Sequence, residues 1–298
     1  MCDDHSIEDM IDATRRAETI SRRQFGSLAI GSGAIAMLSS CAAAPTVTGA
    51  AAVKESEVEI KTPNGTCDAY FVHPASGKHP AVLVWPDIFG LRPAFRQMGK
   101  RLAESGYSVL VVNPFYRAKK APVAAPGANF QDPATRSALM ALAGGLNQET
   151  AFTDAKAFVA WLDTQAAVDK KRKVGTTGYC MGGPLIMRTA AIVPDRIGAA
   201  ASFHGGGLVT ANPDSPHLLI PKMKAKFLIA VAENDDARQP EAKTVLAQTF
   251  AKANLPAEIE VYAGAQHGWC PPDAAVYNQV QAEKAWDRLL VLLKSALA

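Results

Sequence analysis

The sequence predicts an α/β fold with a mostly parallel central sheet and helices on both of its faces. Three continuous apolar runs, at 81–85, 109–112 and 227–231, are typical of strands buried on both sides. Segments with apolar residues at helical spacing, as at 152–162 and 243–253, alternate with such runs. Alternation of strand and helix favours a parallel sheet, because each crossover helix packs against one sheet face.

An antiparallel hairpin is expected before the first buried run. Strand-like alternation at 58–60 and an apolar run at 69–72 flank Thr62–Gly65, which has the composition of a turn. The remaining expected elements are strands at 174–179, 199–203 and 259–262 and helices at 95–103, 184–192 and 275–297. Residues 119–145, rich in Ala and Pro, interrupt the rhythm and predict a loop or short helices above the site.

The composition is that of a globular protein, with 48% hydrophobic residues, 20% charged residues and a net charge of +3. The basic residues form no stripe, so nucleic acid is not an expected partner. The cysteines have no repeated spacing and no Cys-x-x-Cys or His-x-x-x-His pair, so neither a metal nor a disulfide framework is predicted. One Cys67–Cys270 bridge remains open. No phosphate-binding loop is found, and no cofactor is expected.

The N-terminal residues 1–41 resemble a twin-arginine export signal. Arg22 and Arg23 directly precede the apolar run 26–38, which is too short to span a bilayer. Cys41 ends a lipoprotein-type cleavage box and would carry a lipid anchor, whereas Ala42–Ala44 offers an ordinary signal-peptidase site. These features predict recognition by the export machinery and a periplasmic location. The alternative is a disordered tail on a cytoplasmic protein. Residues 42–56 are expected to form a linker, followed by one domain at 57–298.

The strongest chemical signal is Gly178-Tyr179-Cys180-Met181-Gly182-Gly183, between an expected strand and an expected helix. In a nucleophile elbow the central residue occupies a strained turn, and only glycine fits two positions before and after it. The turn points the side chain toward a helix N-terminus, where the dipole favours a thiolate. Cys180 is therefore the candidate nucleophile, with a structural buried cysteine as the alternative.

Two further residues complete the order nucleophile, acid, base along the chain. Asp235 follows the strand that ends at Val231, and His267 follows the strand that ends at Tyr262. The carboxyl ends of parallel strands are where ligands bind in such sheets. Asp236, the next carboxylate on the same loop, is the rival acid.

The chain resembles the dienelactone hydrolase (carboxymethylenebutenolidase) family, which has the α/β-hydrolase fold. The resemblance extends from about Val58 to Ala298. It is carried by the following stretches: Asp87–Leu91, Arg101–Tyr107, Asn113–Arg117, the Cys180 elbow, Glu233–Asp235 and Tyr262–Gly268.

This resemblance implies a Cys180–His267–Asp235 triad, with the backbone amides of Ile88 and Met181 as the oxyanion hole. The family has a glutamate, which holds the thiol in an inactive pose until substrate enters, where this chain has Asp87, one methylene shorter. The resemblance therefore implies that Asp87 is a catalytic-site residue that reaches Cys180 or only touches His267, and capping of a loop is the alternative. The family also places an arginine that grips a substrate carboxylate where this chain has Pro271. Arg136 matches the second substrate arginine only loosely.

Other loop residues beside the expected site are candidates for substrate contact. They are Phe115, Tyr116, Arg117, His204 and Trp269. Structural packing is the alternative for each of them, and Trp85 is expected in the core.

The predicted function is hydrolysis of a carboxylic ester or lactone, a small molecule, through a covalent acyl-thioester on Cys180. A thiolate attacks the carbonyl, and His267 protonates the leaving alkoxide and then activates water. The alternatives are a thioesterase or peptidase-like enzyme of the same fold and a binding protein without turnover.

Overall fold

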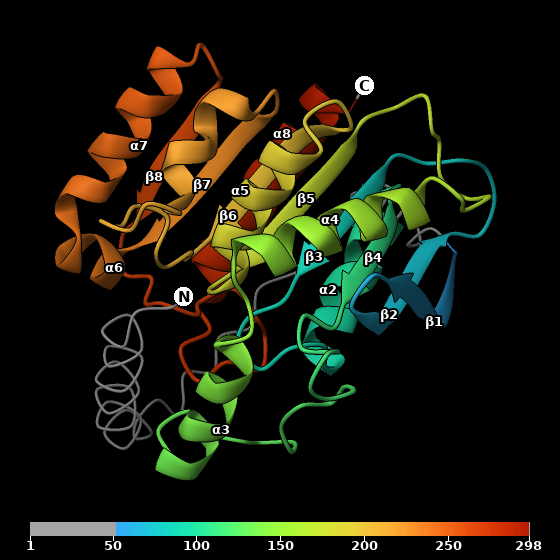
Figure 1. The fold of residues 1–298 in the computed structure, drawn as a ribbon, viewed down its shortest axis with the longest axis horizontal. Helices are drawn as coiled ribbons and strands as arrows, with labels where there is room; N and C mark the ends of the chain where they lie inside the picture. Colours follow the sequence, from blue (N-terminus) through green and yellow to red (C-terminus); the bar gives the residue numbers. More distant parts are fainter. Residues whose placement is uncertain (1–51, 298) are drawn as a thin grey trace, which may run out of the picture.

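The computed structural model describes residues 52–297, and Figure 1 shows their arrangement. The expected export signal and most of the expected linker lie outside these residues. Within them, one sheet holds eight strands in the order β1-β2-β4-β3-β5-β6-β7-β8. The strands are β1 (Val53–Thr62), β2 (Gly65–Pro74), β3 (Ala81–Trp85), β4 (Ser108–Val112), β5 (Val174–Tyr179), β6 (Ile197–Phe203), β7 (Lys226–Ala232) and β8 (Ala257–Tyr262).

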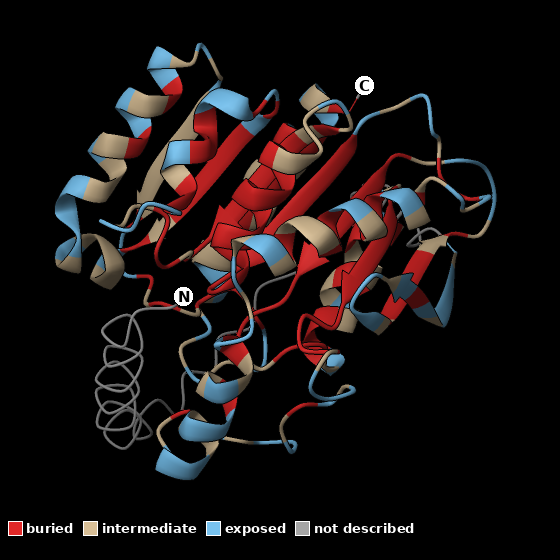
Figure 2. Ribbon diagram, in the orientation of Figure 1, coloured by how far each residue is buried: buried red, intermediate tan, exposed pale blue. Residues whose placement is uncertain are grey.

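The helices of residues 52–297 surround this sheet, and most of them pack on its two faces. They are α2 (Pro93–Glu104), α3 (Pro133–Ala143), α4 (Gln148–Leu162), α5 (Gly182–Ile192), α6 (Glu233–Arg238), α7 (Pro240–Lys252), α8 (Gln279–Ala296) and the 3₁₀ helix η1 (Pro216–Lys222). Side chains alternate along each strand, so Leu83 packs in the core cluster of α4, α5 and α7, while Val84 packs in that of α2 and α8. Figure 2 shows the buried sheet between these layers.

The predicted fold is confirmed, because β3 to β8 are parallel and β1 pairs with β2 as an antiparallel hairpin. The hairpin closes with Thr62 opposite Gly65. β1 begins at Val53, earlier than the expected domain boundary at residue 57. After Val53, its first residues are polar and exposed at the sheet edge, so hydrophobic alternation does not mark them. Their backbone nevertheless pairs with β2, and Val53 lies opposite Pro74.

Two regions around the site differ from a simple alternating pattern. Glu233–Arg238 form the short helix α6 instead of a loop. Its first turn contains acidic residues, whose negative charge stabilises the helix through interaction with the positive end of its dipole. The Ala/Pro-rich segment contains α3, which makes few contacts with other helices or strands and projects beyond the sheet in Figure 1.

The cysteines within the described residues are all unbridged. Cys67 packs in the cluster on one face of the sheet and Cys270 in the cluster on the other. The sheet therefore separates them, and the bridge left open by the sequence does not form. No helix in the described part of the chain has the length and apolar character needed to cross a membrane.

Candidate active site

Cys180 lies in the tight turn between β5 and α5, with φ of 53°, in the left-handed region that side chains other than glycine rarely adopt. The flanking glycines make this turn sterically feasible. A Cβ on Gly178 would stand 2.2 Å from the carbonyl oxygen of Gly182, and one on Gly182 would stand 2.5 Å from that of Trp85. Residues 178–183 therefore form the strained elbow that their sequence predicts.

The two amides expected to bind an oxyanion lie beside this elbow. Ile88 and Met181 belong to the same buried cluster as Cys180. Met181 is the N-cap residue of α5, so its N–H is at the positive end of the helix dipole. No other residue in the range 52–297 accepts a hydrogen bond from either amide. Both donors are thus available to a negatively charged oxygen.

His267 is bound to the short helix α6, which carries the candidate acid. Its Nδ1 lies 2.7 Å from Oδ2 of Asp235, and its backbone N–H donates to Oδ1 of Asn234 at 2.8 Å. The His267 side chain is 1% exposed and that of Asp235 12% exposed, so the pair is shielded from water. Because Nδ1 faces a carboxylate, it carries the proton, and Nε2 is the nitrogen that accepts one.

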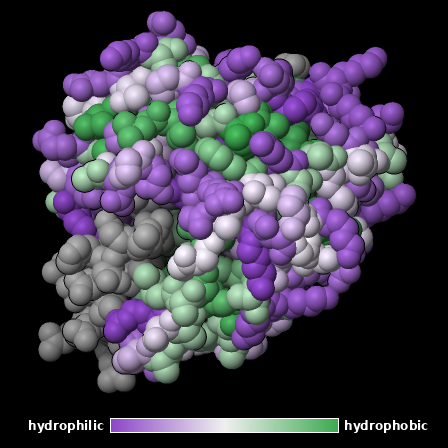
Figure 3. All heavy atoms as spheres, in the orientation of Figure 1, coloured by the Kyte–Doolittle hydropathy of each residue, from purple (hydrophilic) through white to green (hydrophobic). Residues whose placement is uncertain are grey.

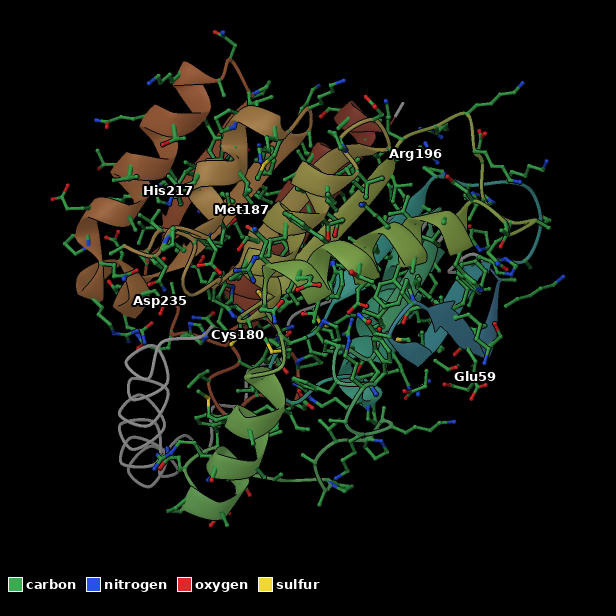
Figure 4. All side chains as sticks on the ribbon, in the orientation of Figure 1. Glu59, Cys180, Met187, Arg196, His217 and Asp235 are labelled. Carbon is green, nitrogen blue, oxygen red and sulfur yellow. The ribbon has the colours of Figure 1, made fainter. Side chains whose placement is uncertain are left out.

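The rival acid has a different partner. Both carboxylate oxygens of Asp236 accept hydrogen bonds from Nζ of Lys243, at 2.6 and 2.8 Å. The turn of α6 therefore directs Asp235 and Asp236 to different neighbours. Figure 4 shows Cys180 and Asp235 at the same end of the sheet, the end at which α3 lies.

Asp87 is held by an arginine. Arg92 donates to both of its oxygens, at 2.6 and 3.0 Å, and the N–H of Phe89 donates to Oδ1 at 2.9 Å. Arg92 also binds both oxygens of Asp273, at 2.7 and 2.9 Å. Asp87 thus caps the loop after β3, one of the roles considered for it, and its charge is neutralised by a guanidinium.

His204 is fully buried between the elbow and His267. Its Nδ1 accepts a hydrogen bond from the backbone N–H of Cys180 at 3.1 Å. Its ring lies edge-on to the rings of His267 and Trp269, with centroids 5.1 Å apart in both pairs. Burial, together with the nearby His267, lowers the pKa of His204 well below its ordinary value, so the imidazole is neutral. His204 therefore links the neighbourhoods of Cys180 and His267.

The remaining candidates separate into two groups. Phe115 shares the buried cluster of Cys180. By contrast, Tyr116 donates its hydroxyl to Asp154 of α4, and Arg117 binds both oxygens of the same carboxylate. The network around Asp154 joins α4 to the loop after β4 and provides a structural role for Tyr116 and Arg117.

Sequence reasoning missed Arg92, Asp273 and Asn234 as parts of this region. Asn234 lies within the stretch Glu233–Asp235 and Arg92 directly follows the stretch Asp87–Leu91, so position in the chain was the available signal, but no role was predicted for either residue. Nothing in the sequence connects Arg92 with Asp273, which is 181 positions away. Over the range 52–297, no group of three or more His, Cys, Asp or Glu side chains is arranged to hold a metal ion.

A parallel sheet with a cysteine on a strand-to-helix elbow and a histidine–aspartate pair at the same edge defines an α/β-hydrolase. The sequence profile of the dienelactone hydrolase family matches residues 67–297. The chain belongs to the dienelactone hydrolase family.

Individual relatives agree with this assignment. A carboxymethylenebutenolidase of Rhodococcus opacus is 29% identical over 212 residues, which cover 70% of this chain and 78% of the relative. Among solved structures, a dienelactone hydrolase-like promiscuous phosphotriesterase from metagenomic libraries has a TM-score of 0.68 at 20% identity, covering 83% of this chain and all of the other. The dienelactone hydrolase of Anabaena variabilis has a TM-score of 0.59 at 16% identity, with coverages of 83% and 99%. At these identities the structures show a shared fold.

Proposed function

We propose that this chain hydrolyses a carboxylic ester or lactone, with Cys180 as nucleophile, His267 as base and Asp235 as the acid that orients it. The observation that carries the proposal is the 2.7 Å Asp235–His267 hydrogen bond beside a strained elbow whose amide is bound by His204. The names of two relatives, a carboxymethylenebutenolidase and a probable 2-oxo-3-(5-oxofuran-2-ylidene)propanoate lactonase, favour lactone or ester bonds as the substrate.

In the proposed reaction, the sulfur of Cys180 attacks the carbonyl carbon while its proton passes to Nε2 of His267. The carbonyl oxygen becomes an oxyanion that the amides of Ile88 and Met181 bind, and loss of one such donor reduces kcat by about 100- to 1,000-fold. The tetrahedral intermediate collapses, the C–O bond breaks, and the departing alkoxide takes the proton from His267.

Water completes the cycle. His267 removes a proton from a water molecule, and the hydroxide attacks the thioester carbonyl. The C–S bond then breaks, the departing sulfur of Cys180 takes the proton from His267, and the acid is released. Asp235 holds the imidazole through Nδ1 and stabilises its charged form in both steps. An alkoxide leaves such an intermediate more readily than an amine, which favours esters and lactones over peptides.

The test compares the wild type with Cys180→Ala on a panel of aryl esters and lactones. We expect activity to disappear in the variant, and iodoacetamide to modify Cys180 in the wild type. Burial raises the pKa of the thiols of Cys67 and Cys270 above their usual range, so both should resist alkylation and Cys270→Ala should retain activity. Peptide mapping identifies the labelled residue. Full activity in Cys180→Ala would overturn the proposal.

We also propose that residues 1–41 direct export. The support is the pair Arg22-Arg23 before the apolar run 26–38. Replacing both arginines by lysine should leave the precursor in the cytoplasm, whereas the unaltered chain should appear in the periplasmic or membrane fraction in a processed form. A cytoplasmic, unprocessed wild type would refute this proposal.

A further inference from the structure

Cys180 belongs to an apolar cluster whose other side chains have no role in the proposed bond-breaking steps. The cluster, here called the acyl cluster, is made of buried residues from the elbow, the loop after β3 and residues 115–146. Its members are Ile88, Phe115, Val123, Phe130, Leu139, Ala143, Cys180 and Met181. Partly buried Phe89, Ala124, Met140, Leu142 and Leu146 pack around it.

We infer that this cluster selects the substrate, and that the acyl group transferred to Cys180 is apolar and uncharged. The inference rests on the proposed hydrolase function and specifies its substrate class. Removing apolar atoms from water stabilises a complex in proportion to the area buried, so an acyl chain gains binding free energy from such surroundings. A carboxylate placed among the same side chains would lose its hydration without gaining a partner.

Three cations near the cluster support this substrate class, because each already has a hydrogen-bond partner. The guanidinium of Arg92 binds Asp87 and Asp273, and that of Arg117 binds Asp154. Lys119 donates to the carbonyl oxygen of Val123. None of these three cations is therefore free to neutralise a substrate carboxylate without first breaking a bond that the structure contains.

The arrangement of residues 115–146 suits a covering segment. The ring of Phe130 meets that of Phe89 edge-on, with centroids 6.3 Å apart, so the segment packs on the loop that carries Ile88. Leu139 and Ala143 lie one helical turn apart and are buried, whereas most other α3 residues are at least partly exposed, as Figure 2 shows. Figure 3 shows apolar residues on the surface in the same region.

One cation offers the competing interpretation. Arg136 lies one turn before Leu139 on α3 and is partly buried. If the substrate carried a carboxylate, Arg136 would be placed to meet it. The experiment must therefore vary the charge of the acyl chain and the side chains of Leu139 and Arg136 separately.

The substrates are 4-nitrophenyl esters of acetate, butyrate and pentanoate, together with the mono-4-nitrophenyl ester of glutarate, which has five carbons like pentanoate but carries a carboxylate. We expect kcat/KM to rise about threefold to fourfold for each added methylene. We expect the glutarate ester to react at least about tenfold more slowly than the pentanoate ester, because its charge must be desolvated.

The variants are Leu139→Ala and Leu139→Ser, with Leu218→Ser as control because Leu218 is 52% exposed. The readout is the pentanoate/acetate ratio of kcat/KM within each protein, which does not depend on how much of the sample is folded. Both changes at Leu139 should lower this ratio several-fold, Ser more than Ala, and Leu218→Ser should leave it unchanged. Arg136→Gln should not alter the pentanoate/glutarate ratio.

Failure of the inference differs from failure of the proposed function. Hydrolysis that requires Cys180 but shows no dependence on chain length overturns the inference alone. So does a preference for glutarate that Arg136→Gln abolishes. Hydrolysis that survives in Cys180→Ala, or the absence of hydrolysis of any ester in the panel, overturns the proposed function and the inference with it.

Discussion

Two aspartates at the same edge of the sheet are bound by different basic side chains. Asp235 follows β7 and Asp87 follows β3, and their side chains are almost equally shielded, at 12% and 11% exposed. Asp235 lies 2.7 Å from the imidazole of His267, whereas Asp87 lies 2.6 Å from the guanidinium of Arg92. An imidazole gains and loses protons near neutral pH, but a guanidinium does not.

Asp235 and Asp87 differ mainly in the side chain that binds them, so this partner, more than position or burial, determines the chemical role of each carboxylate. The Asp235–His267 pair is suited to moving a proton, because Asp235 stabilises the charge that the imidazole acquires. In the Asp87–Arg92 pair the guanidinium keeps its charge near neutral pH. Arg92 also binds Asp273, in the loop after His267. It therefore ties together the two loops that carry Ile88 and His267.

The largest expected effect is that of Asp235→Asn. The amide cannot stabilise an imidazolium and favours the wrong tautomer of His267, so kcat should fall by about 1,000- to 10,000-fold, as for the same change in a serine triad. Steady-state hydrolysis of the best aryl ester measures it. Asp236→Asn is the matched control, since Asp236 is bound by Lys243, and should change kcat by less than about threefold. Equal losses in both variants would remove the distinction between the two carboxylates.

The next effect tests the fixed pair. Arg92→Gln leaves Asp87 without its guanidinium and should lower the free energy of unfolding by about 2–4 kcal/mol, measured by urea denaturation. Asp87→Asn, which leaves Arg92 bound to Asp273, should lower it less, and the double variant should recover part of the loss. Strictly additive losses would show that the pair contributes no coupling. Greater loss of kcat in Asp87→Asn than in Asp235→Asn would reverse their roles.

The comparison also shows which parts of the site the sequence made predictable. Cys180 directly follows β5, and Asp235 and His267 come shortly after the ends of β7 and β8. Because the carboxyl ends of parallel strands meet at one edge of a sheet, the placement of all three residues at this edge follows from local patterns. The glycines at 178 and 182 are required by close backbone contacts within the same motif. Local patterns therefore predict both the elbow and the loops around it.

Pairings between distant loops were not predictable in this way. Arg92 meets Asp273 through two irregular segments without periodicity. Tyr116 and Arg117 follow a strand and so were expected at the site, yet they bind Asp154, whose position on α4 depends on helix packing. The start of β1 was missed because an exposed edge strand is held by backbone hydrogen bonds and lacks an apolar pattern.

The smallest expected effect concerns His204, an imidazole that, unlike His267, has no carboxylate partner. Among residues 52–297 no Asp or Glu forms a hydrogen bond or ion pair with His204, and burial lowers the pKa of His204 well below 6.5. Above pH 6.5 the folded and unfolded states are both neutral at this residue. As the pH falls below 6.5, the unfolded chain binds a proton that the folded protein does not, so the free energy of unfolding decreases by about 1.4 kcal/mol for each pH unit until the folded protein is also protonated.

His204→Asn should remove this loss. The Asn side-chain oxygen takes the place of Nδ1 as acceptor for the Cys180 amide, and Asn tolerates the φ of 42° found here. Between pH 7.5 and 5, urea midpoints of the variant should therefore fall less than those of the wild type. His217→Asn, where burial lowers the pKa to a lesser extent, should show a smaller difference. If the urea midpoints of His204→Asn and the wild type fell equally with pH, His204 would take up its proton in the folded state. His204 would then connect Cys180 and His267 as a neutral imidazole only above the pH of that protonation.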